Sequence, residues 1–157
     1  MIDNARLLNH IRALNLPNSG IGYCERQITG GPSRTVGEYA VKSVSGHYMS
    51  RKAGAMIDFE SRSSELGYLL ESELDPSIWW IGAQPESVNV YRHDSRGRKI
   101  TKQYTPDFLV ITATSAYIVE VKTHEALEKL CEDYPSDWLR ESDGTFRFLP
   151  AERAFAD

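Results

Sequence analysis

The amino-acid sequence predicts an α/β (α+β) domain in which helices flank a mixed central β-sheet. Residues 3–14 and 60–74 have apolar positions at helical spacing. Residues 78–121 contain several runs of strand length that are rich in β-branched and aromatic residues. A further helix and strand follow these runs, so the elements can pack in layers around a shared core.

The N-terminal part, residues 1–58, is predicted to be a helix followed by an irregular arm. The apolar residues of the helix recur at helical spacing: Leu7, Leu8, Ile11 and Leu14. Pro17 and the polar residues after it end this helix. Residues 20–57 are rich in Gly, Ser and Thr and are interrupted by Gly30-Gly31-Pro32, so we expect little regular structure there.

The second part, residues 59–157, holds the other predicted elements. Residues 60–74 are strong helix formers with Ser61 or Ser63 available as N-cap, and Asp75-Pro76 ends the helix. The strands expected after it are residues 78–81, 87–91, 100–104, 106–112 and 115–121. Residues 124–133 are expected to form a helix and residues 145–149 a last strand.

The composition is that of an ordinary globular domain. The chain has 157 residues, of which 41% are hydrophobic and 25% charged, and this suffices for a core without disulfides or metal. No apolar stretch reaches the roughly 20 residues that span a bilayer, and the N-terminus lacks the layout of a signal peptide. We therefore expect a cytoplasmic protein with Cys24 and Cys131 as free thiols.

Charge is distributed unevenly along the chain. The net charge is −4, but residues 1–58 carry seven Lys/Arg and four Asp/Glu, which leaves −7 for the remainder. A basic patch interrupts this acidic remainder: Arg92, Arg96, Arg98, Lys99 and Lys102. Such a patch on a hairpin turn is either a phosphate-binding surface or a solvated turn. Because metal ions supply positive charge at a site, an acidic chain can still act on a nucleic acid.

Two acidic residues are predicted to meet across a hairpin. If residues 106–112 and 115–121 are strands joined by a tight turn, Asp107 lies directly opposite Glu120. Directly opposed side chains have Cβ atoms about 4.5–5.5 Å apart. Two carboxylates at that separation repel unless a cation lies between them. Lys122 lies two residues beyond Glu120 and therefore shares its face of the sheet.

This arrangement suits Mg²⁺, with Mn²⁺ as a substitute, because Mg²⁺ binds carboxylates and keeps several waters. A bound water, held and deprotonated with help from Lys122, can attack a phosphodiester in line. Glu65 on the preceding helix can complete the site through a second metal or through water. The alternative is that Glu120 and Lys122 are ordinary residues of a solvated strand edge. The long apolar runs beside both acids argue against it, because an unpaired buried carboxylate is costly.

Four pieces of the segment 59–122 carry further information: SELGYLLESELDP (64–76), AQP (83–85), YTPDFLV (104–110) and IVEVK (118–122). Through these pieces, which stand in the family's order, the segment resembles the catalytic domain of TnsA-type transposon endonucleases, within the PD-(D/E)xK restriction-endonuclease-like group. The resemblance implies a restriction-endonuclease-like core and identifies residues 59–157 as the nuclease domain.

Carried over to this chain, the resemblance implies Glu65, Asp107 and Glu120 as the acids at the metal. It implies Lys122 as the lysine of the site, and Val121 as a metal ligand through its backbone carbonyl.

Two positions depart from the family pattern or stay open. The family often has two glutamates four residues apart at the helix start, whereas Glu60 and Glu65 are five apart and cannot face one site together. We choose Glu65, because the residues that follow it match the family. Gln84 is either a residue adjacent to the site or a polar residue at a strand end before Pro85.

The resulting hypothesis is a Mg²⁺-dependent DNA endonuclease subunit that cleaves one strand of double-stranded DNA at transposon ends. The resemblance alone implies its partners, a DDE-type (TnsB-like) transposase and other transposition proteins. Two alternatives stay open. One is a stand-alone restriction, repair or defence nuclease of the same fold, and the other is a non-catalytic DNA- or protein-binding subunit with residues 1–58 as an assembly arm.

Overall fold

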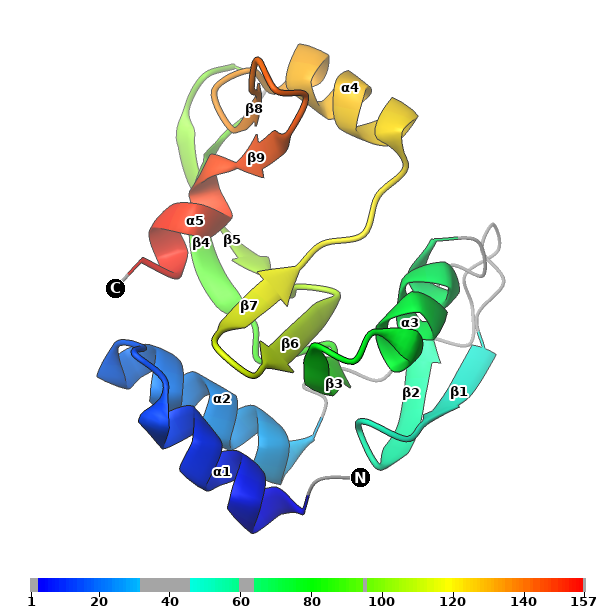
Figure 1. Cartoon of the computed structure of the whole chain (residues 1–157). Coiled ribbons are helices and arrows are strands. Elements are labelled where there is room, and N and C mark those ends of the chain that lie inside the picture. The colour runs from blue at the N-terminus through cyan, green and yellow to red at the C-terminus, as the bar shows by residue number, and fades with distance from the viewer. Residues whose placement is uncertain (1–2, 32–45, 60–63, 95, 157) are drawn as a thin grey trace. The chain divides into compact units, whose positions relative to one another are not determined.

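A computed structural model describes residues 3–31, 46–59, 64–94 and 96–156 (Figure 1). These residues form an α+β fold whose helices are α1 (Asn4–Ala13), α2 (Asn18–Gly30), α3 (Glu65–Leu74), α4 (His124–Asp133) and α5 (Leu149–Ala154). The strands are β1 (Gly46–Ser50), β2 (Ala55–Phe59), β3 (Ile78–Ala83), β4 (Val88–His93), β5 (Lys99–Tyr104), β6 (Phe108–Thr112), β7 (Ala116–Val119), β8 (Trp138–Arg140) and β9 (Phe146–Phe148).

The chain divides into two compact units. The first comprises Met1–Glu86 and Thr105–Val121, and the second comprises Ser87–Tyr104 and Lys122–Asp157. The proposed division at residue 58 into an arm and a nuclease domain stays a prediction. No helix among the described residues is both long and apolar enough to cross a membrane.

The first unit is built around the three-stranded antiparallel sheet β3-β6-β7. All five residues of β6 are buried, which explains why this strand reads as an unbroken apolar run. Phe108 and Val110 pack with Leu69 of α3 and with Ile57 and Phe59 of the β1–β2 hairpin. From α1, the His10 ring hydrogen-bonds the Thr112 carbonyl, with Nε2 2.9 Å from the oxygen.

The second unit contains the β4–β5 and β8–β9 hairpins with α4 and α5. Its aromatic residues form a small cluster, in which the rings of Trp138 and Phe148 stack with centroids 4.6 Å apart. Asp137 is fully buried and pairs with Arg92 of β4, with 3.0 Å between Oδ2 and Nε. A charge with no exposure needs such a partner, so this ion pair holds the β8–β9 end to β4.

The structure differs from the sequence prediction in the N-terminal part. Residues 18–30, most of which were expected to be irregular, form α2. Strand β1 lies within the rest of the stretch 20–57, and β2 begins in it. The buried side chains of α2 follow helical spacing: Tyr23, Cys24, Gln27 and Ile28. Three interspersed glycines hide this pattern in the sequence, and tertiary burial outweighs their low helix propensity. The predicted caps Ser61 and Ser63 and the residue Glu60 lie outside the described residues.

The sheet organisation also differs. Every strand pairing among the described residues is antiparallel, so the expected mixed sheet is found as one three-stranded sheet and three two-stranded pairs. Four of these five pairings join consecutive strands through short connections, which favour antiparallel pairing because a parallel pair needs a long crossover. The β3–β6 pairing is the exception, because the β4–β5 hairpin lies between these two strands in the chain.

Truncation of the core side of α3 should destabilise the protein. Leu69 has no exposed surface, and Leu69→Ala should lower the free energy of unfolding by about 2–5 kcal/mol through the cavity it leaves. Leu74 on the same helix is 84% exposed, so Leu74→Ala is the matched control and should cost less than about 0.5 kcal/mol. Urea unfolding followed by circular dichroism measures both. Equally small effects would contradict the position of Leu69 in the core.

Candidate metal centre at the ends of three strands

The β6–β7 hairpin has the register that the sequence predicts. Phe108 pairs with Val119 and Ile111 with Ala116. The Thr112 N–H donates to the Ser115 carbonyl at 2.8 Å and closes a two-residue turn. Continuing this register by one pair places Asp107 across from Glu120. Both acids are half-buried and lie immediately beyond the regular ends of the strands, which are shorter than predicted.

The backbone of Asp107 is bonded to both neighbouring strands. Its N–H donates to the Val119 carbonyl at 3.1 Å, and its own carbonyl accepts from the Gln84 N–H at 2.9 Å. The β3–β6 register, in which Ala83 pairs with Phe108, continues to a Gln84–Asp107 pair. Gln84, Asp107 and Glu120 therefore form one row across the ends of the three strands.

Gln84 adopts a backbone conformation that is uncommon for its residue type. Its φ is 46°, in the left-handed region, and its side chain is buried with 4% exposure. The residue before a proline ordinarily prefers extended backbone, so no sequence rule indicates this conformation before Pro85. Such strain persists only where the surrounding structure enforces it, and it clusters at functional sites. Gln84 therefore lies in the row with Asp107 and Glu120, and its role in the site stays a prediction.

Helix α2 holds the segment that follows Gln84. The Glu86 N–H donates to Gln27 Oε1 at 3.1 Å, and the Tyr23 hydroxyl donates to the Glu86 carbonyl at 2.6 Å. Gln27 is itself buried and donates through Nε2 to the Gly31 carbonyl at 2.9 Å. Residues of the supposed arm therefore position one side of the candidate site.

The carboxylate of Asp107 is oriented by the chain opposite. Its Oδ2 accepts a hydrogen bond from the Val121 N–H at 2.7 Å. The Val121 side chain packs against the core, so the main chain at this position is fixed beside Asp107. This backbone contact was not predicted, because no side-chain pattern encodes it.

Glu65 is the first residue of α3, directly after the N-cap position Ser64. Tyr68 stacks on Phe108 with ring centroids 5.4 Å apart, and Leu69 packs in the same core. Residues three and four apart share a helix face, so Glu65 lies on the face of α3 that packs toward the start of β6. Burial raises the pKa of the Tyr68 hydroxyl above its ordinary value.

The remaining predicted residue is Lys122, which follows Val121 in the chain. It is exposed and is the first residue after the end of the first unit.

The donor set at the row is compatible with magnesium. Within the described ranges, no three His, Cys, Asp or Glu side chains gather closely enough to hold a metal ion. Magnesium is ordinarily held by one or two carboxylates and completes its shell with waters, so it does not require a third side chain. Asp107, Glu120 and the Val121 carbonyl are hard oxygen ligands of the required kind.

The strain at Gln84 gives a testable signature. Gln84→Gly and Gln84→Ala both remove the side chain, but only glycine relieves the positive φ, so the glycine variant should be more stable by about 1 kcal/mol. The same pair at Asn89, an exposed position in β4, is the control and should show the ordinary order, with glycine less stable by roughly 0.5–1 kcal/mol. Urea unfolding compares the four variants. Alanine equal to or more stable than glycine at position 84 would contradict the strained conformation.

The chain matches the protein-family model described as TnsA-like endonuclease N terminal over residues 75–156. The matched segment is slightly more than half of the chain and contains Gln84, Asp107, Glu120, Val121 and Lys122, whereas Glu65 precedes it. No curated protein matches the chain at a significant level. The chain therefore belongs to the family of TnsA-like endonucleases, a group of nucleases related to transposition.

Proposed function

We propose that this chain is a Mg²⁺-dependent DNA endonuclease subunit that cuts one strand of double-stranded DNA at transposon ends. A DDE-type (TnsB-like) transposase, together with other transposition proteins, is the proposed partner. The main support is the row formed by Gln84, Asp107 and Glu120 at the ends of three paired strands. Membership of an endonuclease family related to transposition supports the DNA substrate.

Asp107 and Glu120 would hold the metal, with the Val121 carbonyl as a further ligand. Bound Mg²⁺ supplies Lewis-acid activation of water and of the scissile phosphate. The hydrogen bond from the Val121 N–H restricts the orientation of the Asp107 carboxylate. Gln84 fixes the main chain of Asp107 from the opposite side.

Lys122 is the proposed proton-handling group. Its ammonium would orient the attacking water and stabilise the negative charge that develops on the phosphate oxygens. Glu65 would act from the start of α3, through water or a second metal.

Substitution of the site residues should remove cleavage while the fold is kept. Asp107→Asn and Glu120→Gln should abolish cleavage, and Lys122→Ala should slow it by about a hundredfold or more. Lys129→Ala, which changes another exposed lysine on α4, is the control and should cut like the wild type. The measurement is nicking of supercoiled DNA with Mg²⁺ or Mn²⁺, with and without the transposase. Retained nicking by both Asp107→Asn and Lys122→Ala would refute the mechanism. Equal cutting without the transposase would favour a stand-alone nuclease.

Metal binding should be measurable without any reaction. Titration calorimetry with Mn²⁺ should show binding to the wild type and loss of binding in Asp107→Asn, because one of the two proposed carboxylate ligands is removed. Lys122→Ala is the matched variant, since it removes a site residue that is not a ligand and should leave metal binding intact. A wild type that binds no metal at millimolar concentration, with or without DNA, would favour a non-catalytic binding subunit.

A further inference from the structure

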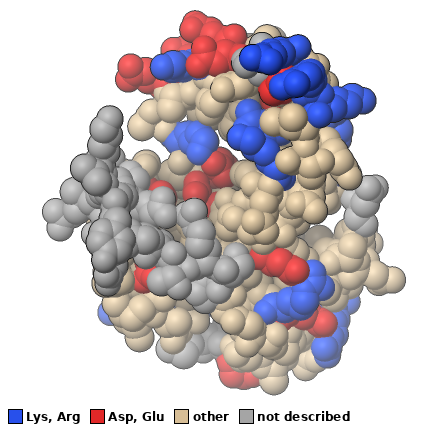
Figure 2. Space-filling model, turned by 180° about the vertical axis from the view of Figure 1, so that it is seen from behind, with Lys and Arg blue, Asp and Glu red and all other residues tan. Residues whose placement is uncertain are grey.

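The second unit contains a basic pocket of about 700 Å³ lined by β4, the start of β5 and α5. Its titratable lining residues are Arg92, His93, Lys99 and Arg153, together with Tyr91. None of the described residues that line it is acidic. Figure 2 shows the Lys and Arg side chains of this unit gathered toward one side and the Asp and Glu side chains toward another.

One of these cations is already neutralised within the fold. Arg92 pairs with the fully buried Asp137, and its guanidinium lies over the Tyr134 and Phe148 rings, 5.1 and 5.6 Å from their centroids. His93 faces the same carboxylate, with 3.7 Å between Nδ1 and Asp137 Oδ1. Arg92 and His93 therefore form the ordered wall of the pocket and are not its free charges.

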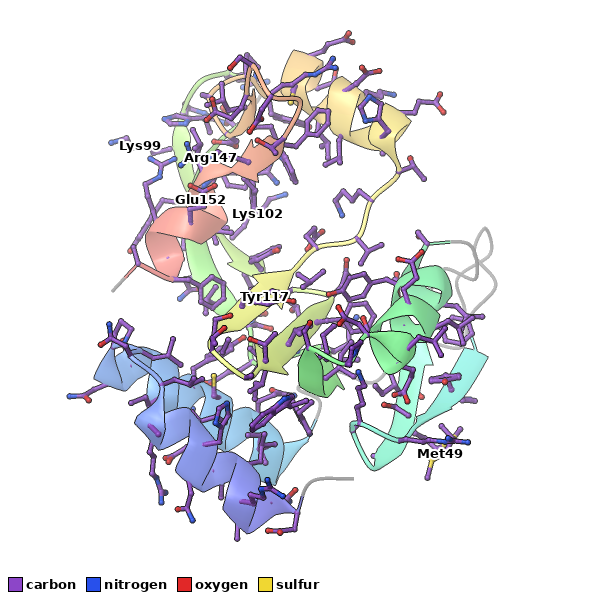
Figure 3. All side chains as sticks on the ribbon, in the orientation of Figure 1. Met49, Lys99, Lys102, Tyr117, Arg147 and Glu152 are labelled. Atoms are coloured by element: carbon purple, nitrogen blue, oxygen red, sulfur yellow. The ribbon has the colours of Figure 1, made fainter. Side chains whose placement is uncertain are left out.

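Lys99 and Arg153 carry the uncompensated charge. Lys99 is exposed across from His93 in the β4–β5 register and extends away from the ribbon in Figure 3. Arg153 is exposed and donates through Nε to the Leu149 carbonyl of its own helix at 3.1 Å. In the described chain no carboxylate lies within ion-pair distance of either residue.

Three other exposed arginines of this unit are ion-paired, whereas Arg96, which does not line the pocket, has no such pair among the described residues. Arg98 pairs with Asp94, Arg140 with Glu128, and Arg147 with both Glu141 and Glu152. The carboxylates near the pocket are thus already engaged, and an anion from outside would meet Lys99 and Arg153 without competition.

The ring of Tyr91 completes the pocket. It is 70% exposed on the same face of β4 as His93. An exposed aromatic ring beside uncompensated cations is the arrangement that binds a nucleic-acid strand, because phosphates pair with the cations while a sugar or base packs on the ring.

We propose that this pocket binds the phosphodiester backbone of a DNA strand outside the candidate metal centre. Lys99 and Arg153 contact phosphates, and Tyr91 packs against a sugar or base. The proposal rests on the proposed function, in which DNA is the substrate, and adds a contact that holds the strand without taking part in the chemistry.

The test is DNA binding by the full chain in EDTA, measured by fluorescence anisotropy over a series of salt concentrations. The probe is a fluorescein-labelled oligonucleotide, single-stranded or annealed into a duplex. The double variant Lys99→Gln/Arg153→Gln should bind roughly tenfold more weakly, and the slope of log K against log salt should fall by about two. Lys129→Gln, which changes an exposed lysine of α4 outside the pocket, should bind like the wild type.

Tyr91→Ala should weaken binding of the single strand more than binding of the duplex, because a base packs on the ring only when it is unpaired.

Two results would overturn the proposal. One is an unchanged affinity and salt slope in the double variant, and the other is an equal loss in Lys129→Gln, which would indicate diffuse charge instead of a pocket. A wild type that binds neither form of DNA would also overturn it.

Plasmid cleavage separates this proposal from the proposed function. If the wild type cuts while the double variant binds DNA normally, the pocket is wrong and the nuclease function stands. If the double variant loses binding while the wild type fails to cut with Mg²⁺ or Mn²⁺, the pocket stands and the nuclease function is wrong.

Discussion

The first unit depends on burial of β6 on both faces. A strand without an exposed side needs a hydrogen-bonded partner along each edge and an apolar cover on each face. Strands β3 and β7 supply the edges, and Leu69 of α3 with the β1–β2 hairpin covers the side of Phe108 and Val110. Once β6 is held in this way, the residues at its end have little freedom. Asp107 directly precedes Phe108, so the core fixes the position of the carboxylate that the proposed chemistry needs.

The sequence alone predicts that Asp107 lies opposite Glu120, but it does not predict that Gln84 lies beside them. A two-residue turn between two apolar runs determines the register of a hairpin, and for this reason the relation of Asp107 to Glu120 follows from the residue pattern alone. The pairing of β6 with β3 along its other edge does not follow from the residue pattern. The whole β4–β5 hairpin separates these two strands in the chain, and no local pattern shows that they pair. The place of Gln84 in the row follows from that long-range pairing. Which side chains serve the reaction stays a prediction.

The helices and strands that the sequence predicted are those with a local signal, and helix α2, which it missed, depends on long-range packing. Helices α1, α3 and α4 have apolar stripes or capping residues that can be recognised in the sequence. Within the described residues, their bounds were predicted to within a few residues. Helix α2 was missed because its helical character comes from packing against the rest of the unit and not from its glycine-rich composition. Strand β8 and helix α5 were missed because three and six residues are too few to establish a period.

The alternation of side chains at the strand ends bears on which acids act together. Phe108, Val119 and Val121 pack into the core on the side covered by α3. Asp107 and Glu120 are each one residue out of step with that set, so strand alternation directs them to the other face of the sheet.

Glu65 starts the helix that packs on the first face. Two carboxylates on one face and a third on the other meet only around the end of the sheet, which accords with the lack of a three-acid cluster among the described residues. The hydrogen bond from the Val121 N–H also draws the Asp107 carboxylate toward the strand end, where the two faces join. In the proposed mechanism, Asp107 and Glu120 are therefore the direct ligands of the first metal, and Glu65 contributes from the helix through water or a second metal.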